Sequence, residues 1–435
     1  MTAPARAKRS ARPRPRASDQ PGERRLRLLI VSAAAPAPTN GGGTRLYNLA
    51  RQLAKRHAVS LVCLMRPEEA SFLEALRPDV ERLIGITAPD LEPLSPWRNR
   101  LHGWRQLLFS RTPRYAATYP VQELEEPLRM LLAETQFNAA LAFELFSAPL
   151  LDYLGPLPAV LIADNVEHDI ARQLLLQAGN PIHWLRDWLM WRRLRAYEVG
   201  WLRRCSAIAA VSPEDGKTIQ AHAPDAHVFL VPNGVDSAVY APPAGAKRNG
   251  RLLFFGTLNY LPNVEGLEWF GREIWARLRA ARPDLGLDIS GKGAHQRLRP
   301  LADAAGVQLL GFAPDIRPRL WQASVCVVPL LSGGGTRLKI LEALAAGCPV
   351  VSTATGASGL DLATGDEILL ADEPADFAAA VLRLLDEPDL WARLSEQGRL
   401  AAAERFDWGP IARQLERACR MAAGRPEPLR PGPQP

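Results

Sequence analysis

The sequence predicts an α/β protein with two doubly wound, Rossmann-like domains, each built on a parallel sheet. Two observations predict this fold class. Short apolar runs alternate with segments of helical periodicity, and most runs end near Gly, Ser or Pro. A segment rich in Pro, Ala and Gly, residues 236–250, separates two such series and is predicted to be a linker. Because ligands of such sheets bind beyond the carboxyl ends of the strands, we expect a central cleft between the domains.

The first series predicts an N-terminal domain over residues 26–235. A loop, residues 33–43, and a helix, residues 44–56, follow its first strand. The series ends at Pro-Asn-Gly, a strong turn signal. The predicted strands are 26–32, 59–65, 139–143, 159–164, 207–211 and 228–231.

The second series predicts a C-terminal domain over residues 251–405. Residues 406–423 are predicted to form a last helix that can cross back to the first domain. The predicted strands are 251–256, 285–290, 307–310, 325–329, 349–352 and 368–371, and the predicted helices include 336–346, 375–386 and 388–404.

The net charge of +7 is concentrated at the N-terminus. Residues 1–25 carry eight basic and two acidic side chains, so this Pro/Arg/Ala tail holds +6 and is predicted to be disordered. It could contact anionic lipid or nucleic acid, or it could be a solvated tail or a misassigned start. The five scattered cysteines, without a CxxC pair, favour a reduced, cytoplasmic protein. No apolar run has the length of a membrane span, and no secretory signal is visible.

A glycine-rich loop before a helix marks a candidate anion site in the segment 325–353. Glycines let a phosphate approach the backbone, and the N–H groups and dipole of the helix start favour negative charge. Basic side chains at a helix start are unfavourable unless an anion is bound beside them. The candidate residues are Gly334, Gly335, Thr336, Arg337 and Lys339.

Glu342 lies three residues after Lys339 and shares its helix face. A carboxylate there can accept hydrogen bonds from a ribose diol while the helix start holds a diphosphate. The alternative is a surface loop followed by an ordinary amphipathic helix with a Lys–Glu pair.

These residues resemble the donor-binding segment of the GT-B glycosyltransferases of family 4, the glycosyl transferases group 1. That family carries two glutamates seven residues apart. Glu342 matches the second, which binds the nucleotide ribose, whereas the first falls at Gly334. The GGGTRLK sequence is similar to the branch found in bacterial polysaccharide glycosyltransferases. The resemblance implies the GT-B fold, a nucleotide diphosphate sugar as co-substrate, and retention at the anomeric carbon. No metal or other cofactor is expected, because the chain has no DxD motif and the cationic phosphate site makes a catalytic metal unnecessary.

The resemblance extends to three other loops of the second half. The segments 253–266, 287–293 and 309–312 match family strands and turns near the donor. The family often places an Arg and a Lys in the first of these loops, and this chain has neither there. We expect Arg337 and Lys339 to supply that charge. The implied donor-binding residues are Gly256, Asn259, Gly291, Gly293 and Phe312.

The predicted catalytic residues lie in the first half of the chain. Its glycine-rich turn, Pro-Thr-Asn-Gly-Gly-Gly-Thr-Arg, ends at Arg45, and in the family this loop reaches toward the donor phosphates. Its glycines include Gly42 and Gly43, which permit a close approach. Side chains after two later strands can contact the donor sugar or handle the acceptor proton. With Arg45, these catalytic candidates are Glu144, Asp164 and His168.

Each candidate also has a structural interpretation. Arg45 could be solvated after a flexible loop, Asp164 could cap a helix, and His168 could be a surface residue. The segment 183–204 contains four tryptophans and six arginines. It predicts either a helix at a lipid surface or a helix packed on the sheet with its basic face in water.

The predicted function is glycosyl transfer to a saccharide or lipid-linked acceptor in bacterial polysaccharide or glycoconjugate synthesis, in the cytoplasm or at the inner membrane face. Alternatives are a GT-B sugar-nucleotide epimerase, an NAD-type dehydrogenase and a nucleic-acid binder. A dehydrogenase requires GxGxxG after the first strand, which neither PAPTNGGG nor SGKGAH matches well. Nucleic-acid binding through the basic tail does not account for the arrangement GGGTRLKxxE, so no nucleic acid is expected as a partner.

Overall fold

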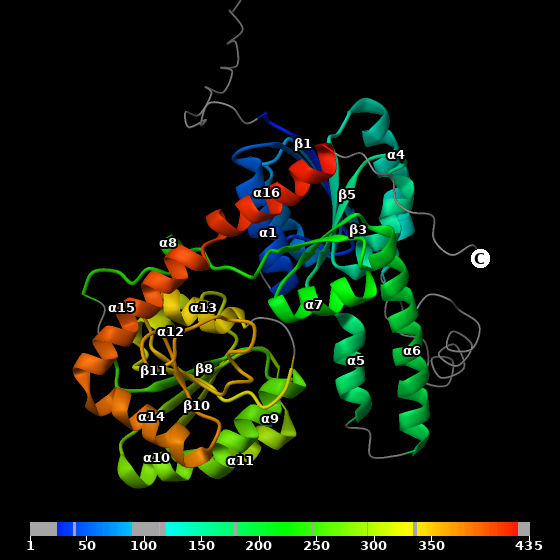
Figure 1. The fold of residues 1–435 in the computed structure, drawn as a ribbon. Helices are drawn as coiled ribbons and strands as arrows, with labels where there is room; N and C mark the ends of the chain where they lie inside the picture. Colours follow the sequence, from blue (N-terminus) through cyan, green and yellow to red (C-terminus); the bar gives the residue numbers. More distant parts are fainter. Residues whose placement is uncertain are drawn as a thin grey trace, which may run out of the picture.

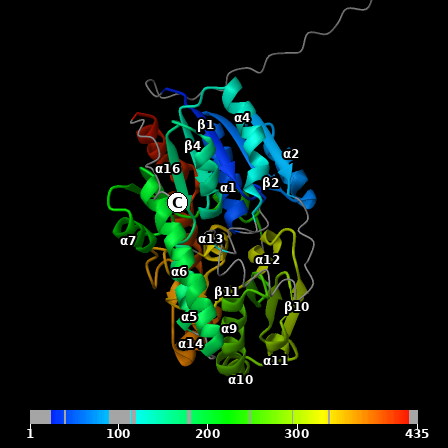
Figure 2. The same cartoon turned by 90° about the vertical axis from the view of Figure 1, so that its right-hand side faces the viewer.

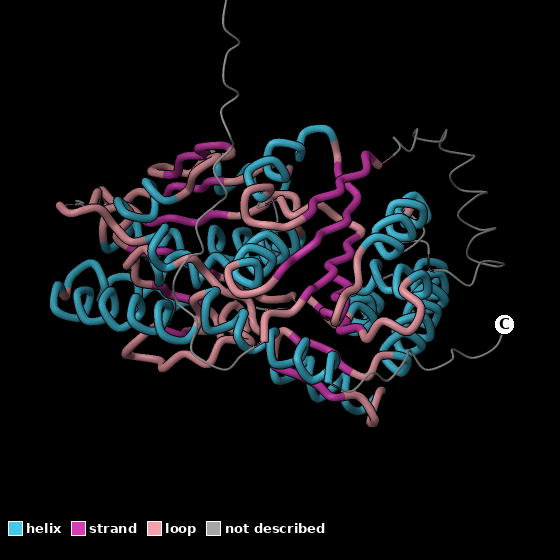
Figure 3. Tube along the Cα trace, turned by 90° about the horizontal axis from the view of Figure 1, so that it is seen from above, coloured by secondary structure: helices cyan, strands magenta, loops and turns pink. Residues whose placement is uncertain are grey.

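The computed structural model describes residues 24–37, 41–88, 113, 119–176, 181–245, 248–293, 295–333 and 337–424. The predicted basic tail therefore lies almost entirely outside the described residues. Two α/β domains stack along the long axis of the molecule (Figures 1 and 2). Helices cover both faces of the sheets (Figure 3). Among the described helices, none is both long and apolar enough to cross a bilayer.

The first domain contains a seven-stranded sheet in the order β3-β2-β1-β4-β5-β6-β7, and all its strand pairs are parallel. Ile30 lies between Leu61 and Leu141 in the register, and all three side chains are fully buried. Burial on both faces explains why these strands read as continuous apolar runs. The strands are β1 (Arg27–Ser32), β2 (Ala58–Met65), β3 (Arg82–Thr87), β4 (Ala139–Phe143), β5 (Ala159–Ala163), β6 (Ala207–Ala210) and β7 (His227–Leu230).

Helices and short 3-10 turns connect these strands. Two of these helices, α5 and α6, run side by side and project from the first domain beside the second (Figure 1). The helices are α1 (Gly41–Ala54), α2 (Ala70–Leu76), α4 (Glu125–Glu134), α5 (Glu167–Leu176), α6 (Pro181–Arg204) and α7 (Pro213–His222), and the 3-10 turns are Pro67–Glu69, Val121–Leu124 and Leu145–Tyr153.

The second domain contains a six-stranded parallel sheet in the order β10-β9-β8-β11-β12-β13. Its strands are β8 (Leu252–Phe255), β9 (Leu287–Ser290), β10 (Val307–Gly311), β11 (Val325–Val328), β12 (Val350–Ser352) and β13 (Leu369–Leu370). A helical stretch runs from α9 (Leu261–Trp269) through a π-helical turn, Phe270–Trp275, into α10 (Ala276–Ala281). The other elements are the 3-10 turn Gln296–Leu298 and the helices α11 (Arg299–Ala302), α12 (Arg317–Gln322), α13 (Leu338–Ala345), α14 (Pro374–Asp386) and α15 (Pro388–Arg405).

The chain crosses between the domains twice. The first crossing contains a short helix, α8 (Ser237–Tyr240), and the second joins α15 to α16 (Trp408–Gly424). The crossings bind each other, since Val235 N–H donates to Phe406 O at 2.8 Å and Trp408 N–H donates to Val235 O at 3.3 Å. The helix α16 then packs against the first sheet and buries Trp408 in its core.

Two predicted helix starts were wrong, and one strand was missed. The helix predicted from Thr44 begins at Gly41, so the glycines belong to its first turn. A side chain at Gly42 or Gly43 would collide with Glu144 or Ala37 as they stand. The helix predicted from Thr336 begins at Leu338, and Arg337 is its extended N-cap residue. The sequence analysis also missed strand β3, which is only half-buried and lies at the sheet edge.

Candidate active site

The carboxyl ends of the two sheets face each other across a cleft. A Cβ atom on Gly41, at the start of α1, would lie 3.7 Å from Leu338 Cδ1, at the start of α13. The two helices are neighbours in both views of the fold (Figures 1 and 2). A pocket of about 210 Å³ is lined from both domains, by residues that include Asn165, Ser212 and Gly333. The described parts of the two glycine-rich segments, residues 41–43 and Gly333, therefore both lie at this cleft.

Three predicted catalytic residues cluster on the first-domain side. Arg45 lies in the second turn of α1, Glu144 follows β4 and Asp164 follows β5. Arg45 Nε lies 2.9 Å from Asp164 Oδ1, and the Arg45 residue is fully buried. Asp164 pairs with Arg45 in this arrangement, and the N–H groups of α5 are capped by Glu198 instead.

Glu144 has unusual backbone and side-chain properties. Among the described residues it is the one non-glycine with a positive φ, at 63°. Such a conformation costs about 1–3 kcal/mol and is often found at functional sites. Burial raises the pKa of Glu144 to about 8, the charges of Asp164 and Glu167 add to the rise, and Arg45 opposes it. Glu144 is therefore mostly a neutral acid at pH 7 and can donate or accept a proton near neutrality.

Gly42 and Gly43 allow the start of α1 to approach this cluster. A Cβ atom on Gly42 would lie 2.1 Å from Glu144 Oε1, and one on Gly43 would lie 2.0 Å from Ala37 O. Glycine is required at Gly43, because the clash there is with the backbone, whereas a side chain at position 42 would displace the Glu144 carboxyl from its observed place.

Arg45 also connects the cluster to the interdomain crossing. Its Nη2 donates to Val231 O at 2.5 Å, and its Nη1 donates to Pro232 O at 2.8 Å and to Asn233 Oδ1 at 3.0 Å. The interpretation of Arg45 as a solvated residue is therefore wrong. Arg45 fixes the first crossing against the carboxylates of the cleft.

The structure does not bring His168 into this cluster. Its ring lies in the packing of α5, α6 and α7, where Nδ1 is 2.6 Å from Glu198 Oε2 and the ring meets His222 edge-on. His168 is 2% exposed, so the surface interpretation is also wrong. The sequence analysis placed it near the site because it follows β5, and it missed Glu198, which organises this helix start from 30 residues away.

On the second-domain side, Lys339 lies in the first turn of α13. Its Nζ donates to Asn263 Oδ1 at 2.8 Å and lies 4.3 Å above the Phe254 ring. A Cβ atom on Gly256 would lie 2.9 Å from this Nζ, so the glycine leaves room for the ammonium group. Burial lowers the pKa of Lys339 to about 7. Among the described residues, the amine thus donates to one amide oxygen, and no salt bridge joins it to a carboxylate.

Glu342 projects from the same helix and binds a residue that the sequence analysis missed. Tyr240 OH donates to Glu342 Oε1 at 2.8 Å. Burial raises the pKa of Glu342, whereas the Tyr240 hydrogen bond and the Lys339 charge lower it. No sequence signal connected these two residues, since they are separated by 102 positions.

The other predicted donor residues lie in the loops that follow β8, β9 and β10. A Cβ atom on Gly291 would lie 1.8 Å from Gly256 O, so the loops after β8 and β9 touch through their backbones. Gly293 has a φ of 91° and packs against Asn259, which is exposed. Phe312, after β10, is 60% exposed and can stack against a planar group.

The central part of the glycine-rich donor loop, Gly334, Gly335 and Thr336, lies outside the described residues. Gly333 has a φ of 110°, and a Cβ atom there would lie 2.6 Å from Arg337 Nη2. Arg337 therefore lies against this loop, although it precedes the helix instead of lying in its first turn. Among the described residues, no group of three or more His, Cys, Asp or Glu side chains is arranged to hold a metal ion.

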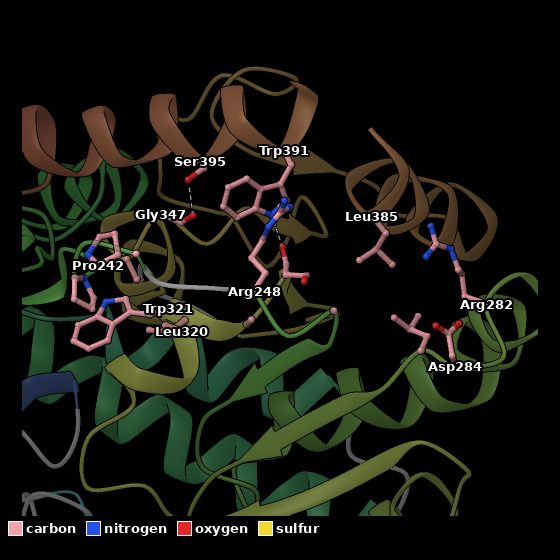
Figure 4. Close-up of a pocket in the computed structure, with 17 residues that line it drawn as sticks. Pro242, Arg248, Arg282, Asp284, Leu320, Trp321, Gly347, Leu385, Trp391 and Ser395 are labelled. Carbon is pink, nitrogen blue, oxygen red and sulfur yellow. Dashed lines mark hydrogen bonds between the residues drawn. The ribbon is translucent and has the colours of Figure 1, made fainter. Parts of the chain in front are cut away.

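A second pocket, of about 780 Å³, lies away from the cleft (Figure 4). Its lining residues Gly250, Leu285 and Ser324 precede β8, β9 and β11, so it lies at the amino ends of the strands. Trp391 and Arg248 face each other there, with the guanidinium 4.1 Å from the ring centre. The predicted site residues are not among its lining.

Comparisons with known proteins agree with this geometry. Residues 249–387 match the model of the glycosyl transferases group 1 family. Sucrose-phosphate synthase from Thermosynechococcus elongatus has a similar structure, with a TM-score of 0.67, 17% identity, and coverage of 91% of this chain and 99% of that one. HepE of Anabaena, in complex with UDP and glucose, gives a TM-score of 0.63 at 16% identity, covering 91% of this chain and 100% of that one.

The protein has the GT-B fold. The phosphatidyl-myo-inositol mannosyltransferase of Mycolicibacterium smegmatis is 31% identical over 208 residues, which is 45% of this chain and 52% of that protein. The chain thus spans about half the length of this relative. The family match covers the GT-B domain that carries Lys339 and Glu342.

Proposed function

We propose that this GT-B protein is a glycosyltransferase that uses a nucleotide diphosphate sugar and a saccharide or lipid-linked acceptor. The observation that carries the proposal is the placement of Lys339 and Glu342 on one helix start, opposite the cluster of Arg45, Glu144 and Asp164. The relatives support it, since one is named a mannosyltransferase and a structural neighbour was solved with UDP and glucose. The resemblance to the family 4 branch with GGGTRLK favours a retaining enzyme of bacterial polysaccharide or glycoconjugate synthesis.

In the proposed reaction, the bond between the anomeric carbon and the diphosphate oxygen breaks, and the acceptor oxygen bonds to that carbon. Lys339 and Arg337 neutralise the charge that develops on the departing diphosphate, so we propose that no metal ion or other cofactor is required. Glu342 binds the ribose diol and fixes the position of the donor. Glu144, with a pKa of about 8, can donate a hydrogen bond to a donor hydroxyl in its neutral form, and its ionised fraction, which grows toward pH 8, can receive the acceptor proton.

A panel of UDP-, GDP- and ADP-sugars tests the proposal by thermal shift, with free glucose as the control. A ligand that binds only the folded state adds about 2.7 kcal/mol of stability at a concentration one hundred times its Kd. We expect one nucleotide sugar to raise the melting temperature of the second domain and glucose to leave it unchanged. If no member of the panel produces a shift, the donor assignment is wrong.

Donor binding is expected to be accompanied by proton uptake at pH 8. Because the pKa of Lys339 is lowered to about 7, most of its amine is neutral at pH 8, and a bound diphosphate raises that pKa and protonates it. Uptake of up to about one proton should appear as a buffer-dependent enthalpy in calorimetric titrations with UDP. It should disappear at pH 6, where Lys339 is already charged, and in Lys339→Met. A buffer-independent enthalpy at pH 8 would contradict this role.

We further propose that the outer surface of α6 contacts an anionic membrane at the cytoplasmic face. Its exposed residues combine apolar and cationic groups, and Arg192 lies 5.7 Å from the Trp188 ring centre, a combination typical of helices at lipid interfaces. We expect Trp184→Ser with Leu185→Ser to reduce sedimentation with phosphatidylglycerol vesicles several-fold, whereas Leu400→Ser, on α15, should not. If the original protein, the double variant and Leu400→Ser all sediment equally, the outer surface of α6 does not bind the lipid. The surface consists of Trp184, Leu185, Arg186, Met190 and Arg192.

A further inference from the structure

Tyr240 lies at the end of the first interdomain crossing, and hydrogen bonds at both ends of the helix α8 fix its position. It is the last residue of α8, and Trp321 Nε1 donates to its carbonyl oxygen at 2.8 Å. At the other end of α8, Ser237 Oγ donates to Asp407 Oδ2 at 2.7 Å, on the second crossing. The position of the Tyr240 side chain therefore depends on both crossings between the domains.

The Tyr240 hydroxyl has one described polar partner, Glu342 Oε1, at 2.8 Å. The Tyr240 side chain is partly buried and packs against the apolar cluster that contains Ile340, Leu341 and Leu344 of α13. Burial and the nearby Glu342 charge raise the pKa of Tyr240, so the phenol remains a donor over the whole physiological range. Within the described part of the chain, no protein donor binds the other oxygen, Oε2.

We infer that Tyr240 is a positioning residue for the nucleotide donor: it orients Glu342 so that Oε2 can accept the ribose diol. The inference rests on the proposed function. A hydrogen bond to Oε1 fixes the rotation of the carboxylate and favours its charged form, so that the bonds a diol donates to Oε2 are well aligned and charge-assisted. Because Tyr240 belongs to the linker, the affinity for the ribose depends on the conformation of the linker.

The test compares two ligands that differ only in the diol, UDP and 2′,3′-dideoxy-UDP, on the full chain. If UDP is not the preferred nucleotide in the panel above, GDP or ADP and the matching dideoxy form replace the pair. We expect Tyr240→Phe to bind UDP about 10-fold more weakly, as the loss of one hydrogen bond to a charged group predicts, and to bind the dideoxy ligand unchanged. Tyr153→Phe is the matched control, since Tyr153 is an exposed tyrosine beside Glu125 in the first domain.

Each other outcome has a defined meaning. Equal weakening for both ligands shows that Tyr240→Phe merely loosens the domain and overturns the inference, as does unchanged affinity for UDP. If the unmodified protein binds UDP and the dideoxy ligand equally well, the diol is not bound by Glu342, and the inference is also overturned. If the protein binds no nucleotide at all, the proposed function itself is wrong.

Discussion

Glu342→Gln is expected to lower transfer from the nucleotide sugar about 100-fold or more without unfolding the protein. Glutamine keeps the size of the side chain and can still accept a hydrogen bond from Tyr240, but it has no charge for the ribose diol. Hydrogen bonds to a charged group contribute about 1.5–3 kcal/mol each, and the two bonds of a diol account for the expected loss. Steady-state kinetics at saturating acceptor measure the loss as kcat/KM for the donor.

The control for this variant is Glu396→Gln, an exposed glutamate on α15 of the same domain. It should retain full activity, and both variants should melt like the original protein. Near-normal turnover of Glu342→Gln would exclude the ribose role of Glu342, even if nucleotide binding by the protein had been demonstrated.

Arg45→Met is expected to destabilise the first domain by about 3–5 kcal/mol, the range measured when one partner of a buried ion pair is removed. The methionine leaves the Asp164 carboxylate buried without its cation and removes the donors to Val231, Pro232 and Asn233. Calorimetry can resolve the unfolding of the two domains, which need not be a single transition. The transition of the first domain should move to lower temperature.

Two further variants test whether the destabilisation by Arg45→Met comes from the burial of the ion pair or only from the loss of one positive charge. Arg51→Met, on the same helix, removes an exposed ion pair with Asp79 and should cost at most about 1 kcal/mol. Adding Asp164→Asn to Arg45→Met should recover part of the stability, because the unpaired charge disappears. If Arg45→Met is as mild as Arg51→Met, the buried pair does not anchor the linker.

Much of the fold could be predicted because most strands of these sheets are buried on both faces. Runs such as Leu28–Val31 are apolar throughout and are visible in the sequence. Strand β3 was missed because it is half-buried and contains Gly85. The start of α1 was misplaced because glycine is a poor helix former, and the close approaches of Glu144 and Ala37, which account for Gly42 and Gly43, are visible only in the structure.

The candidate site could be predicted only in part, for a similar reason. Loops that follow parallel strands share an edge, so Glu144 and Asp164 could be placed together from their order in the chain. The direction of a side chain after a strand is set by its neighbours. The contact with Glu198 holds the His168 ring among the packed helices and away from the cleft. The Tyr240–Glu342 contact depends on how the linker folds back onto α13, which no local pattern encodes.

The return of α16 to the first domain affects the order in which the protein can fold during synthesis. Trp408, Ile411 and Leu415 complete the first core, yet the whole second domain is synthesised between strand β7 and these residues. At a synthesis rate of about 5–20 residues per second, the earliest half of the chain waits roughly ten seconds or more for its final helix. The core of the first domain is therefore completed only after the second domain has been synthesised, and during that interval its unfinished apolar face is open to chaperones.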